Sequence, residues 1–162
     1  EFSNFARLPN PNFKNKNVFD TLSALISDYE LNNKNIKFTN KLHSKKIMLN
    51  IDNSQISRVF QNIIVNSIHS IQVTKISNGE IIYGSYENED NVVIFFIDNG
   101  IGLKYEKDEL VKPYFTTKKK IGGSGLGLAI VEKILFDHHA DFQLANRNDE
   151  EKGVEVKITF SR

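Results

Sequence analysis

Hydrophobic and polar positions along this chain follow two periods, and their order predicts a fold class. Apolar residues recur every three or four positions over residues 18–31, 52–72 and 124–138, which is typical of helices that bury one face. Shorter alternating or continuous apolar runs predict strands at 36–42, 46–51, 81–86, 92–97, 141–146 and 153–160. Strand pairs joined by turns and separated by helices predict a two-layer α/β sandwich, with a mixed, mostly antiparallel sheet packed on about three helices.

Three segments allow more specific predictions about individual strands and helices. The run VVIFFI at 92–97 is apolar on both faces, which predicts a central strand, paired as a hairpin with 81–86. Asp52 and Gln55 have the spacing of a capping box, which predicts that the second helix starts near Asp52. In the last strand every second residue is apolar, so one face is expected to be buried: Val154, Val156, Ile158 and Phe160.

Two stretches have no clear period. We interpret residues 1–17 as the end of a helix followed by a polar linker, because Pro9 and Pro11 stop a helix. The globular domain is then 18–162. Residues 98–122 predict a loop of about 25 residues, and a loop of that length in a compact domain is usually functional or mobile.

Composition excludes several classes of protein. The 162 residues, of 18.5 kDa, correspond to one domain, and the net charge of +1 argues against a broad nucleic-acid-binding surface. The absence of cysteine excludes disulfides, thiolate catalysis and cysteine zinc sites. No apolar run reaches the roughly 18 residues of a membrane span. We therefore expect a soluble chain, or a soluble piece of a larger protein.

The second predicted helix carries polar side chains beside its apolar stripe. Gln55, Asn62, Asn66 and His69 fall on one face, about 100° round the helix from the apolar residues. This stripe is either a helix edge facing water or a row of amides that bind a hydrated metal ion and phosphates. An Asn carbonyl oxygen is a suitable ligand for Mg²⁺.

Two glycine-containing segments add candidate chemistry. Asp98-Asn99-Gly100-Ile101-Gly102 follows the predicted central strand, where a carboxylate could accept a hydrogen bond from an amine such as that of adenine. The alternative is a plain turn without a binding role, because Asn-Gly is a common turn dipeptide.

The second glycine segment, residues 122–127, opens the third predicted helix, where backbone N–H groups favour phosphate. It fits neither the Walker A loop nor the dinucleotide fingerprint. Such a helix start also occurs without a ligand. The preceding PYFTTKKK (113–120) is either a phosphate-binding or a solvated basic loop.

Together these segments resemble the catalytic ATP-binding domain of sensor histidine kinases. The Asn-x-x-x-Asn helix, DNGIG, PYFTTK and GGSGLGLAIV, in this order over residues 52–131, are similar to the N, G1, F and G2 boxes of that family. The leading EFSNFARLPNP resembles the segment before this domain in NtrY-type nitrogen-regulation kinases. The resemblance implies the Bergerat fold, with ATP under a lid at about 103–122.

The resemblance also implies roles for individual residues. Asn66 would coordinate Mg²⁺ and Asn62 would support the phosphates. His69 lies one turn beyond Asn66 on the side of the nucleotide, and the resemblance gives it no defined role. Asp98 would accept the adenine amine. The remaining implied contacts to the nucleotide come from Gly100 and Gly102 at the base, from Leu103 at the start of the lid, and at the phosphates from Thr117, Lys118, Gly123, Ser124, Gly125, Leu126, Gly127 and Leu128.

What the family needs besides this domain is missing from the sequence. None of His43, His69, His138 and His139 has the expected context of the phospho-acceptor histidine, so the acceptor would lie on a separate dimerisation hairpin. The implied function is transfer of the γ-phosphoryl group of ATP to that histidine, and onward to an aspartate of a response regulator. The chain is expected to be monomeric and cytoplasmic, whether or not its parent protein is anchored in the inner membrane.

Two other functions share the fold. One is an ATPase clamp of the MutL, Hsp90 or gyrase-B kind, although such proteins need further segments that this length does not hold. The other is a binding module that has lost ATP, against which the intact Asn, Asp and Gly positions argue.

Overall fold

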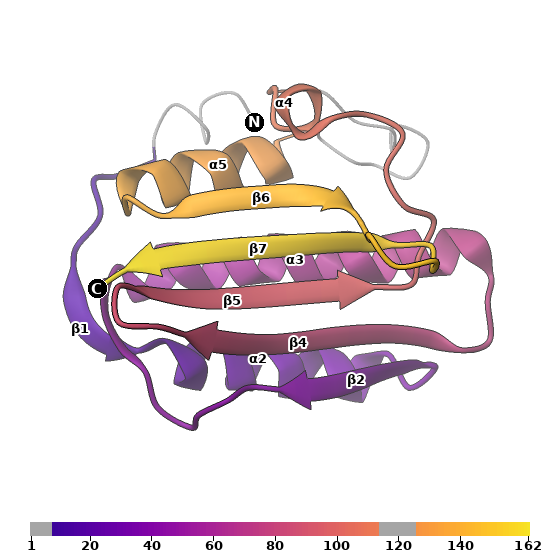
Figure 1. The fold of residues 1–162 in the computed structure, drawn as a ribbon, viewed down its shortest axis with the longest axis horizontal. Helices are drawn as coiled ribbons and strands as arrows, with labels where there is room; N and C mark the ends of the chain where they lie inside the picture. The colour runs from indigo at the N-terminus through magenta and orange to yellow at the C-terminus, as the bar shows by residue number, and fades with distance from the viewer. Residues whose placement is uncertain (1–7, 114–125) are drawn as a thin grey trace.

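The computed structural model describes residues 8–113 and 126–162, and it places helices against one face of a five-stranded sheet (Figure 1). The strands Ile36–Lys41 and Gly79–Glu87 are parallel to each other, and the other neighbouring strands of this sheet are antiparallel. In spatial order the strands are β2 (Ile36–Lys41), β4 (Gly79–Glu87), β5 (Asn91–Asp98), β7 (Val154–Ser161) and β6 (Asp141–Asn146). The predicted mixed, mostly antiparallel sheet is therefore confirmed.

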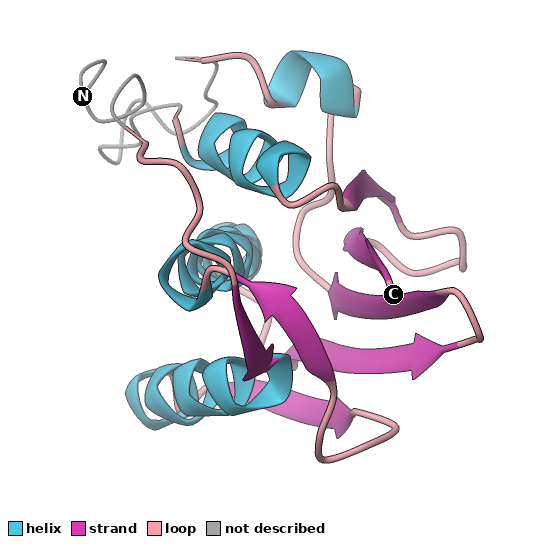
Figure 2. Cartoon of the chain, turned by 90° about the vertical axis from the view of Figure 1, so that its left-hand side faces the viewer, coloured by secondary structure: helices cyan, strands magenta, loops and turns pink. Residues whose placement is uncertain are grey.

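The helices form the second layer (Figure 2). Helix α3 (Asn53–Thr74) lies between α2 (Val18–Asn32) and α5 (Gly127–Asp137) and packs on both. A short helix, α4 (Lys107–Leu110), lies near the edge strand β6. The two-layer α/β sandwich is confirmed. Among the described residues, no helix is long and apolar enough to cross a membrane.

Helix α3 forms as the pattern predicts. The Asp52 side chain accepts hydrogen bonds from the backbone N–H groups of Ser54 and Gln55, which satisfies two of the donors that a helix start leaves free. The predicted stripe is buried along its length: Ile56, Val59, Phe60, Ile63, Ile64, Ser67, Ile68 and Ile71.

Strand β5 is the central strand, as predicted. Its face toward the helices is fully covered, with Val92, Ile94 and Phe96 each at most 1% exposed and Phe96 against Phe60 of α3. No helix of residues 8–113 or 126–162 lies on the other face. Its apolar residues are covered by neighbouring side chains: Val93 is buried, and the ring of Phe95 meets that of Tyr86.

The predicted pairing of the strands at 36–42 and 46–51 is wrong. Instead β2 pairs with β4, and β3 (Met48–Ile51) pairs with β1 (Lys14–Asn17) in a separate antiparallel ribbon. The sequence KNKN of β1 lies in the predicted polar linker. It has no apolar alternation that would predict a strand, because this ribbon strand is exposed on both faces.

Two other boundaries differ from the prediction. Helix α5 begins at Gly127 rather than at residue 124, with Leu126 as its N-cap. The predicted loop at 98–122 contains α4, which has no buried residue and so no apolar period to reveal it. Residues 114–125 of that loop lie outside the described part of the chain.

We expect Phe60→Ala to lower the free energy of unfolding by about 3–5 kcal/mol, because it leaves a cavity between α3 and β5. Val73→Ala on the same helix, at a side chain 56% exposed, serves as the control and is expected to change it by less than about 0.5 kcal/mol. Urea denaturation measures both. Equal losses in the two variants would contradict the assigned core.

Candidate functional site

Asp98 ends the central strand as a buried carboxylate, only 3% exposed. Its Oδ1 accepts hydrogen bonds from the backbone N–H groups of Gly100, at 2.9 Å, and Val154, at 3.3 Å. The Ser67 hydroxyl of α3 also donates to this carboxylate. Because Asp98 is held from the following loop, from β7 and from α3, its position and orientation are fixed.

Burial raises the pKa of the Asp98 carboxyl above its ordinary value of 3.8. The hydrogen bonds from Gly100, Ser67 and Val154 and the charge of Arg147 act in the opposite direction, since they favour the ionised form. The bond from the Gly100 N–H is that of an Asx turn, and a buried carboxylate with a shifted pKa makes the same strand end a candidate functional site.

The loop after Asp98 packs closely on the last turn of α3. A Cβ at Gly100 would lie 2.2 Å from Ser70 Oγ, so no larger residue fits there without a shift. The Ile101 backbone N–H donates to Ser70 Oγ at 3.0 Å. Gly102 has φ +83°, a left-handed conformation that favours glycine. Both glycines of the predicted motif are thus required by the backbone path.

The start of α5 meets the asparagine face of α3. A Cβ at Gly127 would lie 2.8 Å from Asn62 Oδ1, and Asn62 Nδ2 donates to the carbonyl of Arg58. Asn66 lies one turn further along the same face and is half-buried, as is His69. Helix α3 therefore carries the two asparagines, faces the start of α5 and contacts the Asp98 loop.

Not every predicted site residue can be placed. Leu126 is buried and Leu128 is partly buried against the core, so their side chains serve packing. Leu103 also packs against the core. The predicted phosphate contacts that lie outside the described residues are Thr117, Lys118, Gly123, Ser124 and Gly125.

The turn between β6 and β7, residues 147–153, also belongs to this region, and sequence analysis did not find it. Arg147 Nη1 donates to the backbone carbonyl of Asp98 at 3.4 Å, and Asn146 bonds the backbone of Leu103. Gly153 fits against Asp98, because a Cβ there would lie 1.8 Å from its carbonyl oxygen. The local sequence signals only a turn, and nothing in it indicates the distant partner.

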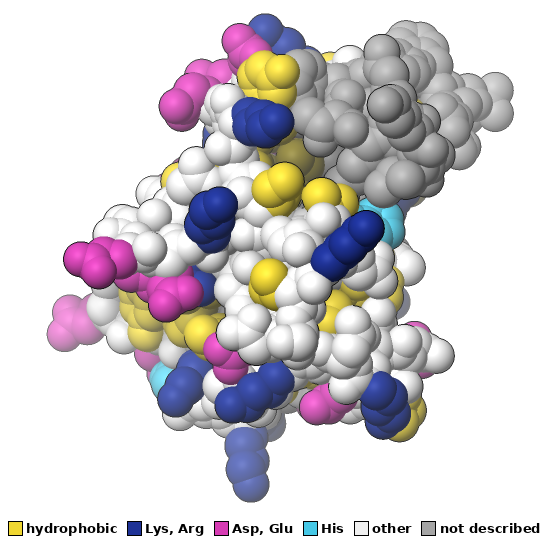
Figure 3. Space-filling view, turned by 90° about the vertical axis from the view of Figure 1, so that its right-hand side faces the viewer, with side chains coloured by type: hydrophobic (Ala, Val, Ile, Leu, Met, Phe, Trp, Pro, Cys, Tyr) yellow, Lys and Arg dark blue, Asp and Glu magenta, His cyan; other side chains and the backbone are white. Residues whose placement is uncertain are grey.

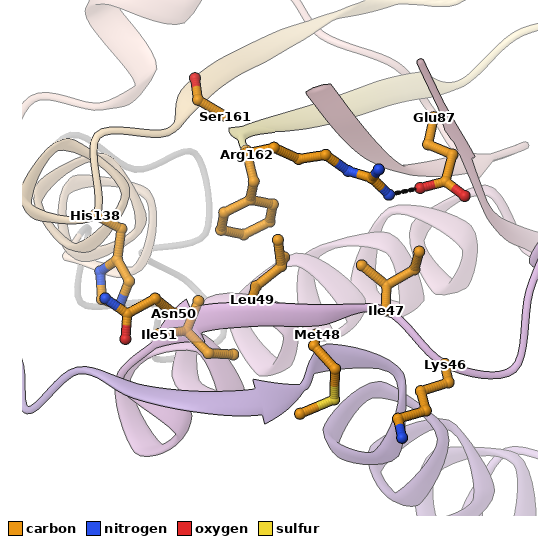
Figure 4. Close-up of a pocket in the computed structure, with 11 residues that line it drawn as sticks. Lys46, Ile47, Met48, Leu49, Asn50, Ile51, Glu87, His138, Ser161 and Arg162 are labelled. Atoms are coloured by element: carbon orange, nitrogen blue, oxygen red, sulfur yellow. Dashed lines mark hydrogen bonds and ion pairs between the residues drawn. The ribbon is translucent and has the colours of Figure 1, made fainter. Parts of the chain in front are cut away.

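A cavity of about 620 Å³ lies elsewhere, at the end of the sheet opposite Asp98 (Figure 4). The ends of β3 and β7 line it together with His138, and Arg162 forms an ion pair with Glu87 at its side. Of the predicted nucleotide-binding residues that the structure describes, none lines this cavity. This cavity is therefore not the candidate site, which is identified by the chemistry of its residues.

On the end of the molecule where β5 finishes, positive and negative side chains are scattered rather than gathered into one patch (Figure 3). Over residues 8–113 and 126–162, no three His, Cys, Asp or Glu side chains cluster as a metal site.

The chain is similar to a family of ATPases and to sensor histidine kinases within it. Residues 51–162 match the family described as histidine kinase-, DNA gyrase B- and HSP90-like ATPase. A relative from Rickettsia typhi named as an NtrY-like sensor histidine kinase is 32% identical over 161 residues, which cover 99% of this chain and 26% of the relative. The nitrogen regulation protein NtrY of Azorhizobium caulinodans is 29% identical, over 99% of this chain and 21% of its own length.

Solved structures agree on the fold. A nucleotide-free form of the catalytic domain of histidine kinase ThkA has a TM-score of 0.79 at 25% identity, covering 93% of this chain and 97% of that one. ThkA in complex with the response regulator TrrA has a TM-score of 0.77 at 23% identity, covering 99% of this chain and 45% of that one. The chain spans about a quarter of the length of the curated relatives that it matches.

We expect Asp98→Asn to change the pH dependence of stability. Because the folded-state pKa of Asp98 is raised, ionisation costs stability as the pH rises from about 4 through the folded pKa. The variant lacks this loss, so its free energy of unfolding relative to the wild type should increase from acid to neutral pH. Urea denaturation between pH 4 and 7 measures it, and a constant difference over this range would contradict the assignment.

Proposed function

Because the chain belongs to the histidine kinase-, DNA gyrase B- and HSP90-like ATPase family, we propose that it is the ATP-binding catalytic domain of a sensor histidine kinase, with its nucleotide site between α3, the Asp98 loop and the start of α5. One observation carries this site: a single helix contacts all of its described parts. Ser67 meets Asp98, Ser70 meets Gly100, and Asn62 meets Gly127.

The adenine end of the nucleotide belongs at Asp98. A carboxylate only accepts hydrogen bonds, so it pairs with the exocyclic amine of adenine and not with the carbonyl of guanine. The backbone amides of Gly100 and Val154 and the Ser67 hydroxyl hold it in place. Gly100 and Gly102 leave room for a flat ring beside the loop.

The phosphate end belongs at the asparagine face. Asn66 is the proposed ligand of Mg²⁺ and Asn62 the proposed support for phosphate, beside the N-terminus of α5, which favours anions. Mg²⁺ is usually held by few protein groups together with phosphates and water, so it fits a site whose described residues form no acidic cluster. The further proposed phosphate contacts are Thr117, Lys118 and the backbone of residues 123–128.

In the proposed reaction, the bond between the γ-phosphorus and the bridging oxygen of ATP breaks as a histidine nitrogen attacks, and ADP leaves. The domain contributes positioning and charge neutralisation. Mg²⁺, when bound, neutralises charge on the phosphates. We assign no general base to the described site residues, and the histidine-bearing domain would supply any that the step needs.

Partners follow from the same proposal. The relatives are named as NtrY-like kinases, which supports a role in nitrogen regulation, and ThkA was seen with a response regulator. We propose a dimerisation hairpin as the phosphoryl acceptor, a response-regulator aspartate as its next recipient, and a cytoplasmic location. A chain that hydrolysed ATP steadily without any histidine acceptor would favour an ATPase clamp instead.

We expect Asp98→Asn to weaken ADP binding at least about tenfold, because an amide N–H₂ group would replace one acceptor and face the adenine amine. Calorimetry measures the affinity. Asp90→Asn, in the β4–β5 turn at the other end of the sheet, is the matched control and should bind as the wild type does. Unchanged affinity in Asp98→Asn would reject the base site.

Asn66→Ala should remove the contribution of Mg²⁺ to ATP binding. Its affinity for ATP with Mg²⁺ is expected to fall by about tenfold, to the level measured in EDTA, where wild type and variant should agree. Gln61→Ala, on the exposed side of the same helix, is the control. A loss of affinity that is equal with and without Mg²⁺ would argue against Asn66 as the metal ligand.

A further inference from the structure

We propose that Asn146, the last residue of β6, is a positioning residue that holds the adenine-binding loop in its binding conformation, a role that rests on the proposed function. Its side-chain amide makes two hydrogen bonds with one residue. The Leu103 backbone N–H donates to Asn146 Oδ1 at 2.7 Å, and Asn146 Nδ2 donates to the Leu103 carbonyl at 3.0 Å. The amide thereby satisfies both backbone groups of Leu103, as a neighbouring strand would.

The backbone of Gly102 fits closely against the side chain of Asn146. It has a left-handed φ of +83°, and a Cβ at this position would lie 2.9 Å from Asn146 Oδ1. A side chain at 102 would therefore both strain the backbone and press on the amide. The second glycine of the motif is explained by the clamp on its neighbour as well as by space for a ring.

The same turn holds the other end of the loop. Arg147 Nη1 reaches the carbonyl of Asp98, and the Val154 N–H reaches its Oδ1. Asp149 orients the Arg147 guanidinium with two hydrogen bonds, at 3.0 and 2.6 Å. The loop from Asp98 to Leu103 is thus fixed at its first residue by Arg147 and Val154, and at its last by Asn146.

The amide clamp affects binding more than folding. Asn146 is exposed, so water replaces its hydrogen bonds when it is removed and the core is untouched. The end of the loop at Leu103 then samples other positions. The apparent affinity for a nucleotide falls by the fraction of molecules in which the loop is correctly placed.

Asn146→Ala tests this inference against Asn88→Ala. Asn88 is also exposed, and its side chain also makes two backbone hydrogen bonds, to the N–H groups of Asp90 and Asn91, but at the opposite end of the sheet. Calorimetry with ADP gives affinity, thermal unfolding gives stability, and amide exchange by NMR reports on the Leu103 N–H.

We expect Asn146→Ala to bind ADP about three- to tenfold more weakly, to exchange the Leu103 amide faster, and to unfold within a few degrees of the wild type. The ratio of ATP affinities with and without Mg²⁺ should stay unchanged, because the clamp acts at the base and not at the metal. Asn88→Ala should bind ADP as the wild type does. Asn146→Asp, which keeps the acceptor and loses the donor, should fall between wild type and Asn146→Ala, and it replaces the alanine variant if that does not fold.

The outcomes separate this inference from the proposed function. If wild type binds ADP, Asp98→Asn does not, and Asn146→Ala binds as wild type does, the positioning role is overturned and the nucleotide site stands. Equal losses of ADP affinity in Asn146→Ala and Asn88→Ala would also overturn it, since they would indicate general destabilisation. A wild type that binds neither ADP nor ATP would overturn the proposed function, and the role of Asn146 with it.

Discussion

The packing of α3 on β5 is the contact on which the rest of the molecule depends. The apolar stripe of α3 seals one face of the central strand, with Phe60 against Phe96, and so fixes the height of the helix above the strand. The C-terminal half of α3 then meets the end of β5, where Ser67 reaches Asp98 and Gly100 fits against Ser70. Core packing and site geometry are therefore one set of constraints, imposed on a single helix.

A buried carboxylate is costly, and its surroundings explain how it is kept. Desolvation disfavours the ionised form of Asp98, while two backbone amides, a hydroxyl and the nearby Arg147 favour it. Those donors come from four places in the sequence, so they offset the cost of burying the charge only once the fold has assembled. In return, the same donors hold the carboxylate in one orientation, as the proposed pairing with adenine requires.

How much the sequence predicts depends on whether the signal is local. The period of α3, the cap at Asp52 and the alternation in β7 are local, and the structure confirms them. The apolar run before Asp98 is local as well, and β5 ends at Asp98 as that run predicts. The local pattern does not predict the polar strand β1 or the clamp from Asn146 to Leu103, because each exists only through a partner that lies 31 or more residues away in the sequence. A turn-like sequence such as ANRND carries no trace of such a partner.

The way the β6–β7 turn closes has an evolutionary consequence. The Arg147 N–H bonds the Gly153 carbonyl, so the hairpin is shut at its base, next to Asp98. Beyond that bond, residues 150–152 are exposed. Insertions and deletions at this tip can accumulate among homologues without altering the geometry beneath it, whereas the residues at the base are expected to resist replacement. Length variation at the tip beside constancy at 146, 147 and 153 is the pattern that such an anchored hairpin should leave in an alignment.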